Sequence, residues 1–438
     1  MIQRHVAHRS MLFWSLFLLL LNLSYTFTIP TTTLREYLIS DSEGDGEGIY
    51  LAMGPAFFGF FGYFGALAGI EDEIYRVIDM DGNADGAEFS PATSLLIEHD
   101  ILRGVSGASA GAMAAVALAA GISPHRGGEF VSRIKLADFA DPGGFGGIMK
   151  GNRFETLMVE FLQTLSPITT KRDINGTWAS LSGFPLQMED ALIPVAVSAV
   201  DMKPRISSPD LSFLEALQSP LKFIASTFFP KAKILLQGSM ARAARASACF
   251  PGLFQPVGWV DRSSWSTSSL LSNNTSSGSH DTSSESSFNG ANDYSLLIDG
   301  GIFDWAGYNG LKDIISATGD NKKAAPQKNQ IRVLNLVIGS FLNGPPGPEA
   351  VSKSLGVDVD SVLSLSINGL PKCGPLAMHK GPFASRAARL AIRAAMGRPI
   401  IATTSTVKID GTTQDDDEQK RQHHFVLDID ASPFVDMN

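Results

Sequence analysis

Residues 104–121 read GVSGASAGAMAAVALAAG, a run of almost only small and apolar residues. Residues 107–111 within it fit the pattern G-x-S-x-G, in which a strand turns sharply into a helix and holds a serine hydroxyl out of the bend. Gly107 and Gly111 lack a Cβ where the backbone folds back on itself, so the strand and the helix can approach closely. The residues after Ser109 suit a helix buried on nearly all sides. The pattern alone favours a nucleophilic Ser109 and a tightly packed helix start about equally.

A second stretch ends in an acidic residue. Residues 295–301 read SLLIDGG, an apolar strand pattern followed by Asp-Gly-Gly, and residues 246–257 upstream of it read ASACFPGLFQPV. Together with the G-A-S-A-G turn, these blocks resemble the patatin-like phospholipase family of lipid acyl hydrolases, and the resemblance spans roughly residues 51–337. It implies a Ser-Asp dyad, in which Ser109 is the nucleophile and Asp299 is the base that acts on it directly, without a histidine.

The resemblance also implies the fold, a three-layer α/β/α patatin-like arrangement with a mostly parallel central sheet. Buried apolar strand patterns that alternate with helical patterns indicate the same class. Gly300 and Gly301 complete the Asp-Gly-Gly motif. The aspartate must be ionised and within hydrogen-bond distance of the serine, and an ordinary pKa of about 3.9 would keep it charged at neutral pH.

Patatin-like enzymes carry a G-G-G-x-x-G loop after the first core strand, and its backbone N–H groups stabilise the oxyanion. In the best frame, the resemblance places this oxyanion hole at Gly54, Ala56 and Gly59. The sequence departs from the family pattern here, because Pro55 has no N–H and Ala56 resists the positive φ that glycine tolerates. A shifted frame would use Gly59, Gly62 and Gly65. The sequence leaves both frames open.

Two further stretches have both a lipid-facing and a purely structural interpretation. Residues 57–64 are mostly aromatic, and they form an acyl-pocket wall, a membrane-facing lip or, as the favoured interpretation, a buried loop and helix start. A helix predicted over residues 385–396 carries a basic stripe that meets either lipid headgroups or, more commonly, solvent. The stripe consists of Arg386, Arg389 and Arg393.

Composition excludes several classes of function. The 438 residues are 44% hydrophobic, enough for a large core, and the net charge of −9 argues against a nucleic-acid partner. The glycine-rich residues 141–151 lack the Gly-Lys-Ser/Thr ending of a nucleotide-binding loop. Residues 79–88 have calcium-loop features, but Ala92 stands where the bidentate glutamate belongs. We therefore predict no metal and no cofactor. Two cysteines, Cys249 and Cys373, provide no disulfide framework.

Residues 1–26 have the form of a secretory signal peptide. Arg4 and Arg9 precede an apolar run at residues 11–21. This run is shorter than the roughly 20 apolar residues of a membrane span, although extension through Phe27 would make it a signal anchor. We expect entry into the secretory pathway at the endoplasmic reticulum. The Phe-led junction at Phe27 would direct the chain to the plastid if its source is an alga with complex plastids.

The rest of the chain is divided by composition. Residues 27–48 are polar and acidic and are predicted as a linker, and residues 49–340 as the catalytic domain. A serine-rich tract at residues 262–293 buries too little apolar area to offset its ordering entropy, so we expect a disordered insertion within a hairpin. Residues 341–438 are predicted as a C-terminal helix and β-hairpin extension packed on the domain.

The family resemblance implies a lipid acyl hydrolase that cleaves glycerolipid esters of a membrane or lipid droplet through an acyl-enzyme. An α/β-hydrolase esterase with a Ser-Asp-His triad is the alternative enzyme, with His379, His423 or His424 as its third member. A catalytically weak lipid-binding relative is a further hypothesis, motivated by Pro55 and Ala56. The sequence does not indicate the head group, the acyl position or the oligomeric state.

Overall fold

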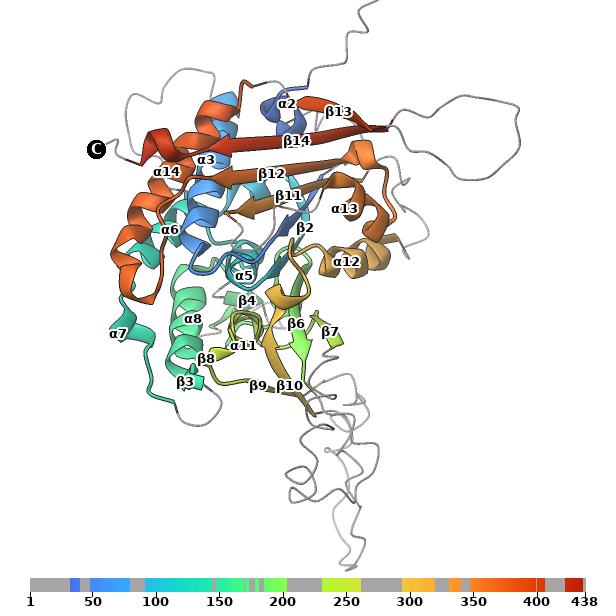
Figure 1. Cartoon of the computed structure of the whole chain (residues 1–438). Helices are drawn as coiled ribbons and strands as arrows, with labels where there is room; N and C mark the ends of the chain where they lie inside the picture. Colours follow the sequence, from blue (N-terminus) through green and yellow to red (C-terminus); the bar gives the residue numbers. More distant parts are fainter. Residues whose placement is uncertain are drawn as a thin grey trace, which may run out of the picture.

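A computed structural model describes most of the chain (Figure 1). The described residues are 32–39, 48–78, 91–143, 147–168, 170–172, 178–180, 185–202, 231–260, 294–319, 331–339, 347–398, 400–405 and 422–435. The predicted signal segment (1–26), the acidic stretch 79–88 and the serine-rich insertion 262–293 lie outside them. Within the described residues, no helix combines the length and the apolar character needed to cross a bilayer.

A ten-stranded sheet forms the centre of the fold, with the order β13-β14-β12-β11-β1-β2-β6-β10-β9 and with β7 paired to β6. The central strands run parallel, and the mostly parallel sheet predicted from the sequence is confirmed. They are β14 (Gln422–Asp430), β12 (Val362–Asn368), β11 (Arg332–Ile338), β1 (Ile49–Met53), β2 (Leu102–Ala108) and β6 (Val195–Asp201). The antiparallel strands are β13 (Ile401–Ser405), β7 (Lys231–Leu235), β10 (Tyr294–Asp299) and β9 (Val257–Val260).

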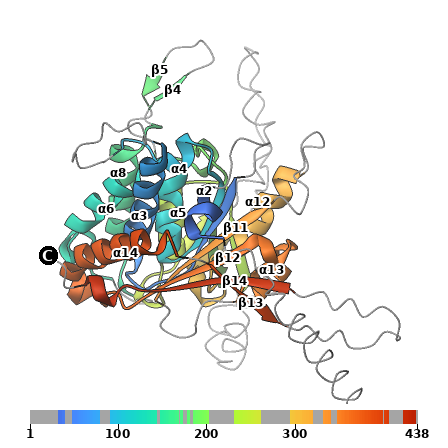
Figure 2. The same cartoon turned by 90° about the horizontal axis from the view of Figure 1, so that it is seen from above.

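Helices cover both faces of the sheet, so the fold has three layers (Figure 2). The larger hydrophobic core lies under α3 (Phe60–Ile78), α5 (Ala110–Ala119), α6 (Pro124–Arg133), α8 (Asn152–Leu165), α11 (Met240–Ser247) and α14 (Gly381–Ala395). A smaller core lies under α12 (Asn309–Gly319) and α13 (Pro348–Leu355) on the other face. Helix α5 is buried on every side, as its composition predicts.

Short elements complete the larger face and the connections. They are α4 (Leu95–Glu98), α7 (Leu136–Phe139), the paired β3 (Gly147–Met149) and β8 (Gly252–Phe254), the paired β4 (Thr170–Arg172) and β5 (Trp178–Ser180), and the 3-10 turns η1 (Met188–Asp190), η5 (Gly300–Ile302), η7 (Val359–Ser361), η8 (Pro375–Lys380) and η9 (Ser432–Phe434). Strand β9 pairs antiparallel with β10, which is the hairpin predicted on either side of the serine-rich tract.

Part of the predicted linker is a structural element of the core, which corrects the sequence interpretation. Helix α2 (Leu34–Ile39) buries Leu34, Tyr37 and Leu38 against the main cluster. These three residues follow the i, i+3, i+4 spacing of one helix face. The Tyr37 hydroxyl also donates to the carbonyl of Val333 at 3.0 Å, so α2 is tied to β11.

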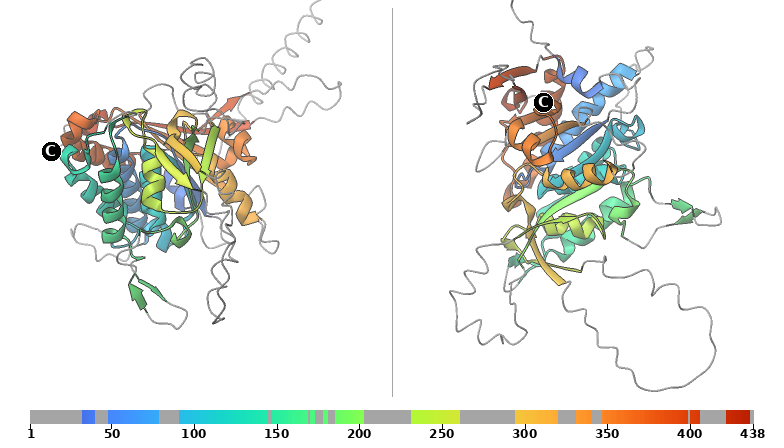
Figure 3. Two further views of the ribbon diagram at one scale, coloured as in Figure 1. Left: turned by 90° about the horizontal axis from the view of Figure 1, so that it is seen from below. Right: turned by 90° about the vertical axis from the view of Figure 1, so that its right-hand side faces the viewer.

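The C-terminal region extends the same sheet. Strands β12 and β14 lie parallel to β11, and β13 pairs antiparallel with β14 at the sheet edge (Figure 3).

Helix α14 packs closely on α3. Gly65 allows this contact, because a Cβ there would lie only 2.0 Å from the Ser385 carbonyl oxygen. Arg389 forms a two-pronged ion pair with Asp72 at 2.7 and 2.8 Å. Burial alone would raise the pKa of Asp72, but hydrogen bonds from His125 and Arg389 lower it to about 2. Arg389 of the predicted basic stripe therefore links α14 to α3.

Candidate active site

Ser109 lies at the sharp turn between β2 and α5, as the G-x-S-x-G pattern predicts. Its φ of 53° is a strained conformation for a residue with a side chain. A Cβ at Gly107 would lie 2.4 Å from the Gly111 carbonyl oxygen, and one at Gly111 would lie 2.3 Å from that of Met53. Only glycine fits at either position, so the two motif glycines let the turn form against β1.

A buried serine that the sequence analysis did not assign holds the Ser109 backbone. The N–H of Ser109 donates to Ser247 Oγ at 2.8 Å, and Ser247 Oγ donates to the Ser198 carbonyl at 2.6 Å. Ser247 therefore connects the turn to β6 from the end of α11. Because Ser109 is strained, this pair of hydrogen bonds favours the conformation that presents its hydroxyl.

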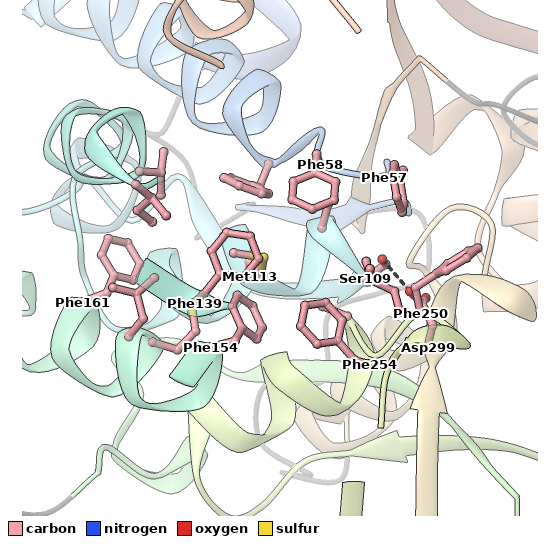
Figure 4. Close-up of a pocket in the computed structure, with 18 of the residues that line it drawn as sticks. Phe57, Phe58, Ser109, Met113, Phe139, Phe154, Phe161, Phe250, Phe254 and Asp299 are labelled. Carbon is pink, nitrogen blue, oxygen red and sulfur yellow. Dashed lines mark hydrogen bonds between the residues drawn. The ribbon is translucent and has the colours of Figure 1, made fainter. Parts of the chain in front are cut away.

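The strand register explains how Asp299 reaches Ser109 from 190 residues away. Strand β6 lies between β2 and β10, and it pairs Ser198 with Ala108 and Ala199 with Asp299. Ser109 and Asp299 therefore lie at one level on either side of β6. Ser109 Oγ donates a hydrogen bond to Asp299 Oδ2 at 2.9 Å (Figure 4).

Asp299 is almost fully buried, and this changes its acidity. Its other oxygen, Oδ1, accepts the N–H of Gly301 at 2.7 Å. A Cβ at Gly300 would lie 1.9 Å from the Ser198 carbonyl oxygen, so the motif glycines bring the carboxylate against β6. Burial raises the pKa of Asp299 to about 6, although the hydrogen bonds from Gly301 and Ser109 lower it. The ordinary pKa expected from the sequence is wrong, but the carboxylate remains mostly ionised at neutral pH.

The loop before α3 lies beside the dyad, and its hydrogen bonds limit which N–H groups can serve an oxyanion. The N–H of Gly54 donates to the Leu336 carbonyl at 3.3 Å, and that of Gly59 donates to Ala56. These two predicted donors are therefore already engaged. Ala56 lies between them, and its N–H has no acceptor among the described residues.

The shifted frame of this loop is wrong. Gly62 and Gly65 lie inside α3. Because neither has a side chain, neighbouring elements can pack closely against the helix at these positions. A Cβ at Gly62 would lie 2.9 Å from Leu370. Pro55 instead packs against the dyad motif, since a Cβ at Gly301 would lie 2.5 Å from Pro55 Cβ.

An apolar cavity opens from the dyad into the larger helical layer (Figure 4). Ten phenylalanine rings line it, together with Ser109, Asp299 and aliphatic side chains of α5, α6 and α8. Phe57, Phe58, Phe60 and Phe64 belong to this lining, whereas Phe61 and Tyr63 are buried in the core. The aromatic run at residues 57–64 is thus both a cavity wall and a helix start.

The histidines proposed for a triad do not reach Ser109. His423 and His424 lie near the amino end of β14, four strands from β2 or about 19 Å, whereas Ser109 follows the carboxyl end of β2. His379 is exposed in η8. Among the described residues, no histidine lines the cavity around the dyad.

The described residues contain no disulfide and no cluster of metal ligands. Cys249 and Cys373 are both free. Burial raises the pKa of the Cys249 thiol to about 12, with a further contribution from nearby Asp299, although Arg245 lowers it. No group of three or more acidic, histidine or cysteine side chains in this part of the chain is arranged to hold a metal ion.

Comparison with known proteins agrees with the fold and the motifs. Residues 97–306 match the family described as patatin-like phospholipase, and this stretch contains both Ser109 and Asp299. Residues 97–306, which carry the dyad, therefore match a domain family of lipid hydrolases. Among solved structures, VipD from Legionella pneumophila is 12% identical, with a TM-score of 0.38 over 81% of this chain and 67% of that chain. Curated protein sequences give no match.

Proposed function

We propose that this protein is a serine esterase that cleaves glycerolipid esters through a Ser109–Asp299 dyad and an acyl-enzyme. The observation that carries the proposal is the 2.9 Å hydrogen bond from a strained serine to a buried aspartate at the mouth of an apolar cavity. The serine supplies the nucleophile, the aspartate supplies the base, and the cavity supplies a place for an acyl chain. Membership of a lipid hydrolase family supports the same reaction class.

In the proposed mechanism, Asp299 accepts the hydroxyl proton while Ser109 Oγ attacks the ester carbonyl carbon. Asp299 then returns this proton to the leaving alcohol, and the acyl group stays on Ser109. Water releases the acyl group in a second step, in which Asp299 accepts a proton from the attacking water and returns it to Ser109 Oγ as the serine leaves. A base with a pKa near 6 suits both transfers at neutral pH, because it is ionised in the resting enzyme and is a stronger base than an ordinary carboxylate.

Two N–H groups are proposed to stabilise the oxyanion. One is that of Ala56, the predicted loop residue whose N–H is still available. The other is that of Ala110, the first residue of α5, which has no acceptor within its own helix. The amino end of α5 adds a positive helix dipole at this point. Together they replace the glycine donors that the loop lacks.

We further propose that the substrate is presented by a lipid surface. Three segments near the dyad, before α3, after α11 and after β10, carry large apolar residues that are 36–46% exposed. They are Phe57, Phe250, Ile302, Phe303 and Trp305. The rings of Phe57 and Phe250 lie 5.4 Å apart, and both line the cavity. An apolar rim around the cavity suits contact with a membrane or lipid droplet better than a freely dissolved substrate.

The proposal is tested by assaying the purified protein on a panel of lipid esters, with a matched pair of serine variants. Ser109→Ala should abolish turnover. Ser106→Ala, three residues earlier in β2, should retain it, because Ser106 is buried and its hydroxyl has no partner among the described residues. Lipid binding without turnover in the wild-type protein would favour the non-catalytic relative instead. Loss of turnover in folded His379→Ala, His423→Ala or His424→Ala would favour the triad.

A further inference from the structure

The cavity beside Ser109 is elongated, with aromatic rings at the end away from the dyad. Figure 4 shows Ser109 and Asp299 at one end of a row of side chains and Phe161 at the other. Met113, one turn after Ser109 on α5, and Phe154 on α8 lie between them. Phe154 and Phe161 are two turns apart, and at 1.5 Å per residue this part of the wall is about 10 Å long.

Three rings from three helices pack together at this end of the cavity. Phe161 of α8 lies 4.9 Å from Phe130 of α6 and 6.0 Å from Phe64 of α3, measured between ring centroids. Phe161 and Phe64 are 2% and 1% exposed. Gly127 lets α6 approach this cluster, because a Cβ there would lie 2.5 Å from the Phe64 ring. We call Phe64, Phe130 and Phe161 the floor cluster.

The space between the dyad and the floor cluster is small. The free volume is about 60 Å³. One ordered water needs about 10–15 Å³, so the cavity admits a chain of several methylene groups. An acyl chain with its carbonyl at Ser109 can therefore extend along the cavity only as far as the floor cluster.

We infer that the floor cluster, through Phe161 above all, sets the upper limit on the length of the acyl chain that the enzyme accepts. This inference rests on the proposed esterase function and adds its specificity-determining residue. A longer chain meets close-packed rings whose displacement is costly. A shorter chain leaves apolar surface unfilled, and each missing methylene lowers kcat/KM roughly fourfold.

The experiment measures kcat/KM on p-nitrophenyl esters from acetate to palmitate. Phe161→Leu and Phe161→Ala open the floor, and Leu157→Phe, a partly buried lining residue one turn earlier on α8, fills the cavity. Phe425→Leu is the matched control, since Phe425 packs on the core from β14, well away from the cavity. Thermal unfolding of each variant establishes that it is folded. The milder Phe161→Leu and the filling variant keep the test decisive if Phe161→Ala fails to fold.

The wild type should show an optimum at one acyl length, with a steep fall in kcat/KM for longer chains. Opening the floor should move this optimum to longer chains, and kcat/KM for an ester four carbons longer than the wild-type optimum should rise about tenfold or more relative to that optimum. Filling the cavity should move the optimum to shorter chains, and Phe425→Leu should leave it in place. An optimum that stays fixed in folded Phe161 and Leu157 variants overturns the inference while leaving the esterase intact. Activity that persists in Ser109→Ala overturns the proposed function itself.

Discussion

Replacing Asp299 with asparagine should remove activity and at the same time stabilise the fold at neutral pH. The substitution keeps the shape and both contacts, because the amide oxygen can accept the Gly301 N–H and the amide nitrogen can donate to Ser109. What it removes is the buried negative charge. An activity loss of several orders of magnitude is expected, since the nucleophile loses its base.

The size of the stabilisation follows from the acidity of Asp299. Its pKa rises from 3.8 to about 6 on folding, so the folded state holds the proton more tightly than the unfolded state. Below pH 3.8 the carboxyl is neutral in both states and costs nothing. Between pH 3.8 and about 6 the unfolded state ionises while the folded state still holds the proton, so the free energy of unfolding falls by about 3 kcal/mol over this window and stays low above it. Asp299→Asn avoids this loss.

The assay is urea unfolding of wild type and Asp299→Asn at a series of pH values from 4 to 7.5. The difference in the free energy of unfolding should grow by about 2–3 kcal/mol over this range in favour of the variant. Asp313→Asn, an exposed aspartate on α12, is the control and should show no such growth. A difference that is the same at pH 4 and pH 7.5 would refute the argument that burial of a charge sets the properties of this site.

Four further predictions concern the same site and the N-terminus. For wild-type protein, kcat/KM should fall about tenfold per pH unit below pH 6, because protonated Asp299 cannot act as the base. If kcat/KM begins to fall only near pH 4, the pKa of Asp299 is not raised. Ser247→Ala should lower kcat roughly tenfold or more with little change in KM, since the strained Ser109 loses the acceptor of its N–H; an unchanged kcat would remove Ser247 from the mechanism. Ala56→Pro should lower kcat about 100-fold or more, and Pro55→Gly should preserve it. If kcat is unchanged in both variants, this loop does not stabilise the oxyanion. N-terminal sequencing of the mature protein should find a start near Phe27, whereas an intact Met1 in a cytosolic fraction would exclude both the signal peptide and the anchor.

The sequence predicts the dyad because each half is a local motif. The glycines at 107 and 111 and those at 300 and 301 are required by backbone contacts of the turns themselves. The register that joins the halves is not local, since it depends on β6 pairing with both β2 and β10. Family resemblance predicted that Ser109 and Asp299 act together, whereas spacing along the chain could not.

Other features depend on contacts that no local pattern contains. The raised pKa of Asp299 comes from burial, and the engaged N–H of Gly54 comes from a carbonyl on β11. The partner of Arg389 is Asp72, 317 residues away. Helix α2 is different, because the sequence itself contains the helical spacing of Leu34, Tyr37 and Leu38, although the surrounding polar and acidic residues predict a linker.

The central claim is that Ser109 carries the acyl group during turnover. Protein mixed with a lipid ester or with p-nitrophenyl hexanoate and quenched in acid during the steady state should gain the mass of one acyl group. Peptide mapping should place this group on Ser109, and the Ser109→Ala protein should show none. Active protein that turns the ester over with no adduct, or with an adduct on another residue, would contradict the account.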